Sequence, residues 1–185
     1  MEVERANAVI DMKLVIADVS VLFDLFHIRA LKDFFALDFE ICTTIYVFNE
    51  IVLEQQIDEF EVYTNSGQLK ILELLPEEEE FVYNFRSKRN LRSIPDKTLL
   101  WKSMQMRCIL LTCDNKLRKE GEDNGIEVHG SIWVVLELVS QMIIAEQKAI
   151  EYLEHLKTVN NRLPIAGIDE IIVRFKSELM KPKSK

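Results

Sequence analysis

Two apolar segments of the chain each end in an aspartate. Residues 14–17 lead into Asp18, and residues 108–113 lead into Asp114. Two further acids, Glu50 and Asp96, lie on predicted helices that could bring them nearby. Converging carboxylates repel one another unless a cation binds them, and oxygen ligands without His or Cys favour Mg²⁺ or Mn²⁺. Such an ion orients a phosphodiester and lowers the pKa of an attacking water.

Each of these acids also has a purely structural interpretation. Asp18 and Asp114 could cap the helices that follow them, and Asp96 stands three residues after a serine, which is the spacing of a capping box. Glu50 could be a solvated surface acid, and Glu54, one turn further on, is an alternative ligand. The metal-site hypothesis therefore depends on the joint placement of the acids.

The hydrophobic pattern predicts strands that alternate with helices. Predicted strands span residues 9–17, 39–42, 69–74, 108–111 and 126–128. Predicted helices span residues 22–28, 43–57, 76–89, 117–123, 131–144, 147–156 and 168–179, with another starting at residue 93. This order indicates a parallel sheet with helices on both faces. Ligands bind at the carboxyl ends of such strands, where Asp18 and Asp114 are expected to meet.

Four segments, in order, resemble the PIN domain (PilT N-terminus) family of ribonucleases. The segments are Leu14–Leu22, with Asp18 and Ser20; Thr43–Leu53, with Glu50; Ile94–Leu100, with Asp96; and Ile109–Leu117, with Thr112 and Asp114. The resemblance implies a three-layer α/β/α fold with a central parallel sheet. It also implies that Asp18, Glu50, Asp96 and Asp114 form the acidic site, with Mg²⁺ or Mn²⁺ as cofactor and Ser20 or Thr112 as supporting hydroxyls.

The resemblance also suggests how the chain is divided. Residues 10–145 are predicted to form the PIN-like nuclease domain, similar to the VapC-like branch that has a longer C-terminal part. Residues 146–185 are predicted to form a helical C-terminal extension packed on that domain. The Lys- and Pro-rich end, residues 181–185, is expected to be a disordered tail.

The charge distribution constrains the nucleic-acid hypothesis. The 185 residues include 23 Lys and Arg against 31 Asp and Glu, a net charge of −8, which excludes a uniformly basic coat but not a local basic track. Basic residues flank both Asp96 and Asp114. Predicted RNA phosphate contacts are Arg86, Lys88, Arg89, Arg92, Lys116 and Arg118. The alternative is that these residues form a solvated surface.

Other motifs narrow the function further. The three cysteines lack zinc-finger spacing, no segment reads as a membrane span, and the protein is expected to be reduced and cytoplasmic. A haloacid-dehalogenase-type phosphatase would need a second aspartate where this chain has Ser20.

The sequence thus predicts a metal-dependent endoribonuclease that hydrolyses RNA phosphodiesters. The resemblance implies the toxin of a toxin–antitoxin pair, with an antitoxin protein as partner beside RNA. Whether the chain forms a homodimer stays open. The alternative is a catalytically inactive PIN-fold module that binds RNA or protein.

Overall fold

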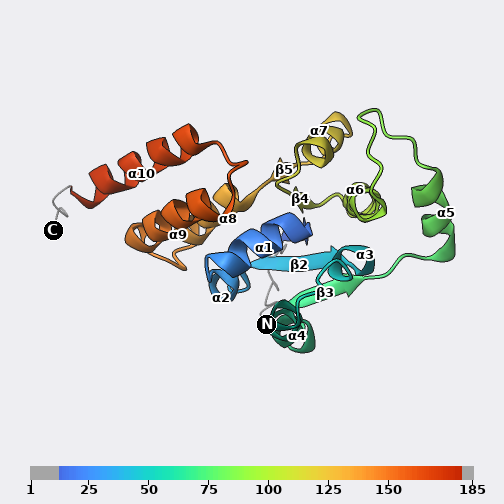
Figure 1. Cartoon of the computed structure of the whole chain (residues 1–185), viewed down its shortest axis with the longest axis horizontal. Coiled ribbons are helices and arrows are strands. Elements are labelled where there is room, and N and C mark those ends of the chain that lie inside the picture. Colours follow the sequence, from blue (N-terminus) through green and yellow to red (C-terminus); the bar gives the residue numbers. More distant parts are fainter. Residues whose placement is uncertain (1–12, 181–185) are drawn as a thin grey trace, which may run out of the picture.

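A parallel sheet forms the centre of the molecule (Figure 1), seen in a computed structural model that describes residues 13–180. Within those residues five strands pair in the order β3-β2-β1-β4-β5, all parallel. The strands are β1 (Lys13–Ala17), β2 (Phe39–Thr44), β3 (Leu69–Leu72), β4 (Ile109–Leu111) and β5 (Val128–His129). Their carboxyl ends therefore share one edge, and β1 pairs with both β2 and β4. The predicted all-parallel sheet is confirmed.

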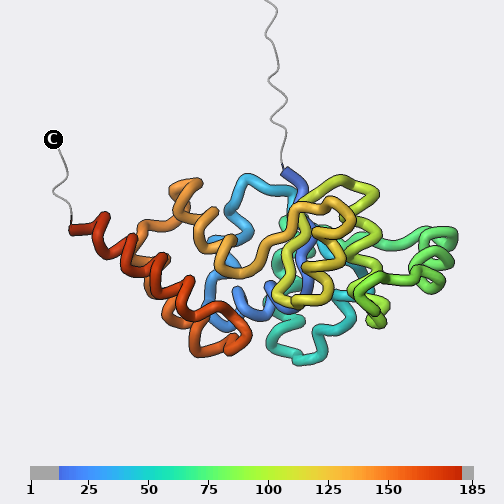
Figure 2. Tube along the Cα trace, turned by 90° about the horizontal axis from the view of Figure 1, so that it is seen from above, coloured from blue at the N-terminus to red at the C-terminus, as the bar shows by residue number. Residues whose placement is uncertain are grey.

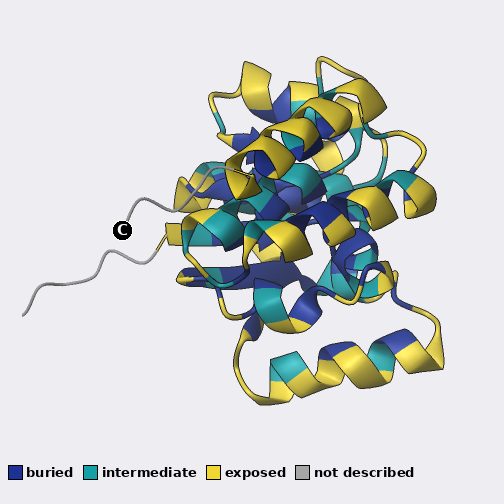
Figure 3. Cartoon of the chain, turned by 90° about the vertical axis from the view of Figure 1, so that its left-hand side faces the viewer, coloured by how far each residue is buried: buried dark blue, intermediate teal, exposed yellow. Residues whose placement is uncertain are grey.

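Helices cover both faces of the sheet, and the alternation of side chains along the strands explains why. Val15 and Ala17 on β1 belong to one buried cluster, whereas Ile16 belongs to another. The helices are α1 (Val19–His27), α2 (Leu31–Phe34), α3 (Ile45–Phe48), α4 (Glu54–Asn65), α5 (Pro76–Asn84), α6 (Ile94–Met106), α7 (Asn115–Asp123), α8 (Ser131–Ser140), α9 (Glu146–Val159) and α10 (Ile165–Leu179). Figure 3 shows buried strands between helices whose outer faces are exposed. The three-layer α/β/α architecture is thus confirmed.

The first cluster joins the sheet to the C-terminal helices. Leu153 on α9 and Ile172 on α10 share it with Leu22 on α1. The second cluster contains Leu99 on α6 and Leu117 on α7, on the opposite face. Helix α5 and helix α10 lie at opposite ends of the long axis (Figure 2). The predicted boundary near residue 145 stays a prediction.

Two predicted segments lie partly or wholly outside the described residues. The strand predicted over residues 9–17 is present from Lys13 onward, and its first four residues lie outside the described part of the chain. The predicted disordered tail, residues 181–185, also lies outside it. Within residues 13–180, no helix is long and apolar enough to cross a membrane.

The single helix predicted over residues 43–57 is wrong. Thr44 caps the short helix α3 by accepting a hydrogen bond from the N–H of Val47 (3.4 Å), and the chain leaves the helix before Glu50. Ile51 is buried, and Leu53 is extended just before α4 begins. Because Ile51 and Val52 are β-branched, they favour this extended connection. Glu50 therefore lies in the turn after α3, not on a helix.

The helix predicted over residues 76–89 is also too long. Helix α5 ends at Asn84, and Phe85 is extended, so the basic residues that follow form a loop rather than a helix end. Long-range hydrogen bonds fix this loop, as described below. Ser93 caps the next helix, α6, as the sequence predicts.

Candidate metal centre

Asp18 lies at the junction of the two central strands β1 and β4. Its N–H donates to the carbonyl of Leu111 (2.8 Å), which continues the β1–β4 ladder by one residue. Its side chain is only 5% exposed. It makes no capping hydrogen bond to α1, so the capping interpretation of Asp18 fails.

Two hydroxyls hold the Asp18 carboxylate in place. Ser20 Oγ and Thr112 Oγ1 both donate to Oδ2, at 2.5 and 2.7 Å. Each hydroxyl accepts in turn from a backbone N–H, Ser20 from Cys113 and Thr112 from Asp114, both at 3.0 Å. The network thus links the ends of β1 and β4 through one carboxylate oxygen. Oδ1 is not engaged by either hydroxyl and can accept another ligand.

Asp114 begins helix α7 and has a structural role that the sequence allowed for. Its Oδ1 accepts from the N–H groups of Lys116 and Leu117, at 2.8 and 2.9 Å, so Asp114 is the N-cap of α7. A carboxylate has a second oxygen, so capping through Oδ1 does not prevent a second contact. The cap fixes the direction of the side chain at the same sheet edge as Asp18.

Asp96 lies in the first turn of α6, where Ser93 is the capping residue. The backbone N–H of Asp96 donates to Ser93 Oγ (3.3 Å), so the serine caps the helix and the Asp96 carboxylate is not needed for this. Burial, together with the charges of Asp18, Asp114 and Glu50, raises the pKa of Asp96 to about 7. This shift shows that the carboxylates from four separate segments share one electrostatic environment.

Burial also acts on Asp18, and the charge of Asp18 acts on Glu50. Burial raises the pKa of Asp18 against the opposing effect of the Ser20 and Thr112 hydrogen bonds. Burial and the charge of Asp18 raise the pKa of Glu50, which is exposed in the turn after α3. Glu54, in the first turn of α4, is exposed as well. Of the two alternative ligands, Glu50 and Glu54, it is Glu50 whose charge raises the pKa of Asp96.

This donor set fits a hard divalent cation. It consists of carboxylate oxygens, with hydroxyls behind one of them, and such oxygen ligands favour Mg²⁺ or Mn²⁺. The sulfur of Cys113, the residue before Asp114, lies against Asp24 and Ser131, and burial with the Asp24 charge raises its pKa to about 11. Within residues 13–180, no three His, Cys, Asp or Glu side chains form a ready-made ion cage. The charges of these acids therefore act on one another, although their side chains do not converge on one point.

The predicted basic residues have different environments. Arg118 donates to the carbonyls of Thr112 (2.8 Å) and Val128 (3.0 Å), so its guanidinium braces the ends of β4 and β5. Arg89 pairs with Asp123 at 2.7 Å. The remaining predicted contacts, Arg86, Lys88, Arg92 and Lys116, are exposed.

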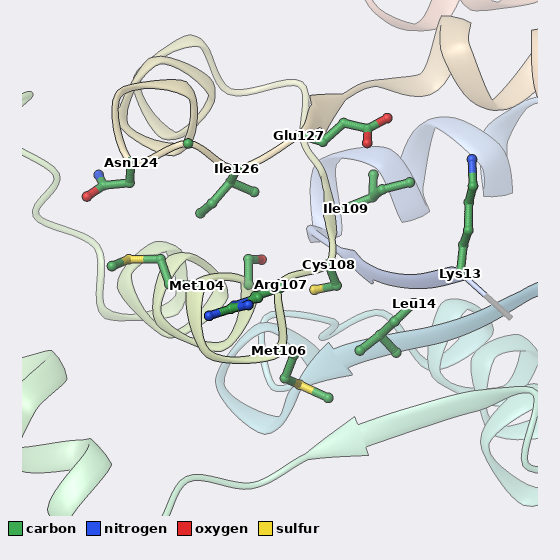
Figure 4. A pocket seen from close by; sticks show the side chains of 12 residues that line it. Lys13, Leu14, Met104, Met106, Arg107, Cys108, Ile109, Asn124, Ile126 and Glu127 are labelled. Carbon is green, nitrogen blue, oxygen red and sulfur yellow. The ribbon is translucent and has the colours of Figure 1, made fainter. Parts of the chain in front are cut away.

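A cavity of about 740 Å³ lies at the opposite edge of the sheet (Figure 4). It is lined by Lys13 at the start of β1, Ile109 at the start of β4, and Arg107, Cys108 and Glu127. The carboxyl ends of the strands are therefore remote from it. None of the four candidate metal ligands lines this cavity.

A second buried network, which no sequence pattern predicts, lies beside this edge. Asp24 on α1 accepts from Ser131 Oγ (2.5 Å) and from Asn160 Nδ2 (2.9 Å to Oδ2), and Cys113 Sγ donates to it (3.4 Å). Asn160 lies between α9 and α10, so this network connects the C-terminal helices to the residue before Asp114. The partners of Asp24 stand 89 to 136 positions from it in the sequence, which leaves no local pattern to recognise.

The fold and this edge define a class: a parallel α/β/α domain with acids at the carboxyl ends of its central strands. A family model described as a PIN domain matches residues 14–177, which is most of the chain. The chain therefore belongs to the PIN-domain family. PIN domains are generally nucleases that use divalent metals and act on nucleic acids. A search of curated proteins finds no match.

Proposed function

We propose that this protein is a metal-dependent endoribonuclease that hydrolyses RNA phosphodiesters. The observation that carries the proposal is that Thr112 joins Asp18, at the end of β1, to Asp114, at the end of the neighbouring strand β4, and that the charges of these acids and of Glu50 act on Asp96. Holding like charges together is unfavourable unless a cation offsets the repulsion. Mg²⁺ or Mn²⁺, when bound, supplies an activated water and orients the phosphodiester.

The residues of the chain would share this task in a defined way. Asp18, Glu50, Asp96 and Asp114 would hold the metal as its ligands. Ser20 and Thr112 orient Asp18 by binding its Oδ2, so neither hydroxyl occupies Oδ1. Hydrogen bonds from groups behind a metal ligand fix the orientation of that ligand. Exposed cations of the loop after α5 and of α7 would contact RNA phosphates.

The biological setting is part of the same proposal. The resemblance to the VapC-like branch supports a toxin that an antitoxin protein blocks, and the three free cysteines suit a reducing cytoplasm. The alternative is a PIN-fold module that binds RNA or protein without turnover. Substitution of Asp18 discriminates between the nuclease and the inactive module. The Asp18 side chain makes no hydrogen bond that caps α1, so a loss of cleavage on substitution would not come from a lost cap.

Cleavage of a mixed structured RNA tests the proposal. We expect cleavage with Mn²⁺ or Mg²⁺, none with chelator, and loss of cleavage on Asp18→Asn. Asp58→Asn, the same substitution on the exposed face of α4, is the matched control and should leave the rate unchanged. RNA binding without turnover under all metal conditions would instead support the inactive module.

A further inference from the structure

A small hollow beside the first turn of α6 concentrates positive charge. It has a volume of about 470 Å³ and is lined by Arg86, Arg92 and Lys97, together with polar and apolar residues but no acid. In the described part of the chain, none of these three cations forms an ion pair, whereas Arg89 of the same loop pairs with Asp123. The hollow is therefore positively charged, although the net charge of the whole chain is −8.

The loop that forms the hollow is held rigidly by one buried carboxylate. Glu120 on α7 is 1% exposed. It accepts from Ser87 Oγ (2.6 Å) and from the backbone N–H groups of Arg89 (2.8 Å) and Lys88 (3.2 Å). Ser87 Oγ accepts in turn from the N–H of Leu91 (2.9 Å). These bonds replace the helical hydrogen bonds that the sequence predicted for this segment.

The hydrogen bonds to Glu120 use the backbone of the loop and leave its basic side chains unpaired with this carboxylate. Burying a carboxylate is costly unless hydrogen bonds satisfy it, and here those bonds come from the loop backbone and Ser87 rather than from an Arg or Lys side chain. The loop cations thus remain available while the backbone that carries them is fixed. A preformed group of cations binds an anion without the entropic cost of ordering the loop.

The position of the hollow relates it to the candidate metal centre. Lys97 lines the hollow and directly follows Asp96 in the first turn of α6. Side chains at neighbouring helix positions point in different directions, but their Cα atoms are about 3.8 Å apart, so a strand whose scissile phosphate reaches Asp96 has a neighbouring phosphate within reach of Lys97. Phe85 also lines the hollow, and aromatic side chains commonly stack on single-stranded bases.

We infer that this hollow binds an internal phosphodiester of a single-stranded RNA, next to the scissile bond, through Arg86, Arg92 and Lys97. The arginines match the geometry of phosphate oxygens with paired N–H donors, and the lysine adds a point charge. Glu120 and Ser87 are positioning residues that shape the loop. The inference rests on the proposed function for the identity of the strand, but binding can be measured without cleavage.

Binding of a labelled single-stranded RNA of about 12 nucleotides, followed by anisotropy in chelator over a salt series, tests the inference. The triple variant Arg86→Gln, Arg92→Gln, Lys97→Gln should bind about tenfold more weakly, and its salt slope should fall by about 0.7, the value for one phosphate of a single strand. The control triple Lys32→Gln, Arg174→Gln, Lys176→Gln removes the same charge from α2 and α10. It should keep the wild-type slope.

Several results would overturn the inference. Equal weakening in both triples would mean that only net charge matters. A strong preference for a 5′-phosphorylated over a 5′-hydroxyl RNA would assign the hollow to a terminal phosphate. Hollow-dependent binding of poly-aspartate that is tighter than that of RNA would assign it to an acidic polypeptide. Circular-dichroism melting of each variant verifies folding.

Failure of the inference and failure of the proposed function are distinguishable. Hollow-dependent RNA binding without metal-dependent cleavage would uphold the inference and reject the nuclease. Cleavage that requires Asp18, with RNA binding unchanged in the hollow triple, would uphold the nuclease and reject the inference.

Discussion

Asp18 and Glu120 are both buried carboxylates, yet their environments are opposite. Asp18 receives two hydroxyls on one oxygen and lies among other acids, and burial raises its pKa. Glu120 receives a hydroxyl and two backbone N–H groups over both oxygens. Although burial acts to raise the pKa of Glu120, these hydrogen bonds lower it overall. A carboxylate satisfied by hydrogen bonds alone builds structure, whereas carboxylates whose charges act on one another are poised for a cation.

Substitution of Asp96 should show the largest effect on the acidic side of this comparison. Asp96→Asn is expected to cut metal-dependent RNA cleavage by more than the about 10–100-fold that loss of a supporting group costs. Folding should be retained because Ser93, and not the Asp96 carboxylate, caps α6. Single-turnover cleavage and thermal melting of the same preparations measure both properties. A destabilised variant with full nuclease activity would show that Asp96 is structural.

Metal addition should stabilise the acid cluster. Ligand that binds only the folded state at 100 times its Kd stabilises by about 2.7 kcal/mol, so saturating Mn²⁺ should raise the Tm by several degrees. Asp114→Asn should reduce this gain, because a ligand charge is lost while an acceptor for the α7 cap remains. Scanning fluorimetry with Mn²⁺, Mg²⁺ and chelator measures the shift. An unchanged wild-type Tm at saturating metal would reject the site.

Glu120 should matter for stability and not for metal. Glu120→Gln removes a charged acceptor from two N–H groups and a hydroxyl, so unfolding free energy should fall by about 1–3 kcal/mol. The comparison variant Asp123→Asn loses only the exposed Arg89 pair and should change stability far less. Urea unfolding quantifies both. If Glu120→Gln were as stable as Asp123→Asn, the buried carboxylate would not be what holds the loop.

In chelator, the contributions of Asp96 and Glu120 to the free energy of unfolding should change with pH in opposite directions. Because the folded pKa of Asp96 is raised from 3.8 to about 7, the folded state holds the extra proton, and wild-type stability should fall as pH rises between these values. Asp96→Asn should therefore match the wild type near pH 4. After solvent screening, it should exceed the wild type by about 1 kcal/mol above pH 7.

Glu120 provides the opposite sign. Its folded pKa is lowered, so its contribution is present above its unfolded value of 4.5 and is lost as pH falls through the folded value. The stability deficit of Glu120→Gln should thus shrink in acid. Urea unfolding of both variants over the same pH series distinguishes the trends. Parallel pH profiles for the two variants would contradict the comparison.

The sequence was most informative where function and local pattern coincide. Apolar strands ending in Asp18 and Asp114 predicted the adjacent carboxyl ends of β1 and β4, because strand burial and the following acid are local signals. The turn that carries Glu50 was not predictable in the same way, since burial of Ile51 is a tertiary effect that breaks a helix-like pattern. Glu50 as a metal ligand stays a prediction from the family resemblance, and the helix predicted to carry it is wrong.

Glu120 shows what a sequence cannot reveal by pattern. On a short polar helix it resembles any solvated acid, and its partners in the loop stand 31 to 33 positions away. The same hydrogen bonds convert the predicted end of α5 into a loop. Lys97 was missed for a related reason: its place beside Arg86 and Arg92 follows from the loop's path and not from sequence spacing.

The smallest expected effect concerns Ser93, which separates capping from catalysis at the start of α6. Loss of an N-cap side chain costs about 0.5–2 kcal/mol, and the 3.3 Å length of the Ser93 bond places Ser93→Ala near the lower end. Because the Asp96 carboxylate stays in place, cleavage should fall only a few-fold, in contrast to Asp96→Asn. Ser93→Thr keeps the hydroxyl and should restore both properties. Urea unfolding and cleavage rates measured on the three variants test this. If Ser93→Ala abolished cleavage while remaining as stable as the wild type, Ser93 would belong to the reactive site itself, and the division between cap and acid at this helix end would be wrong.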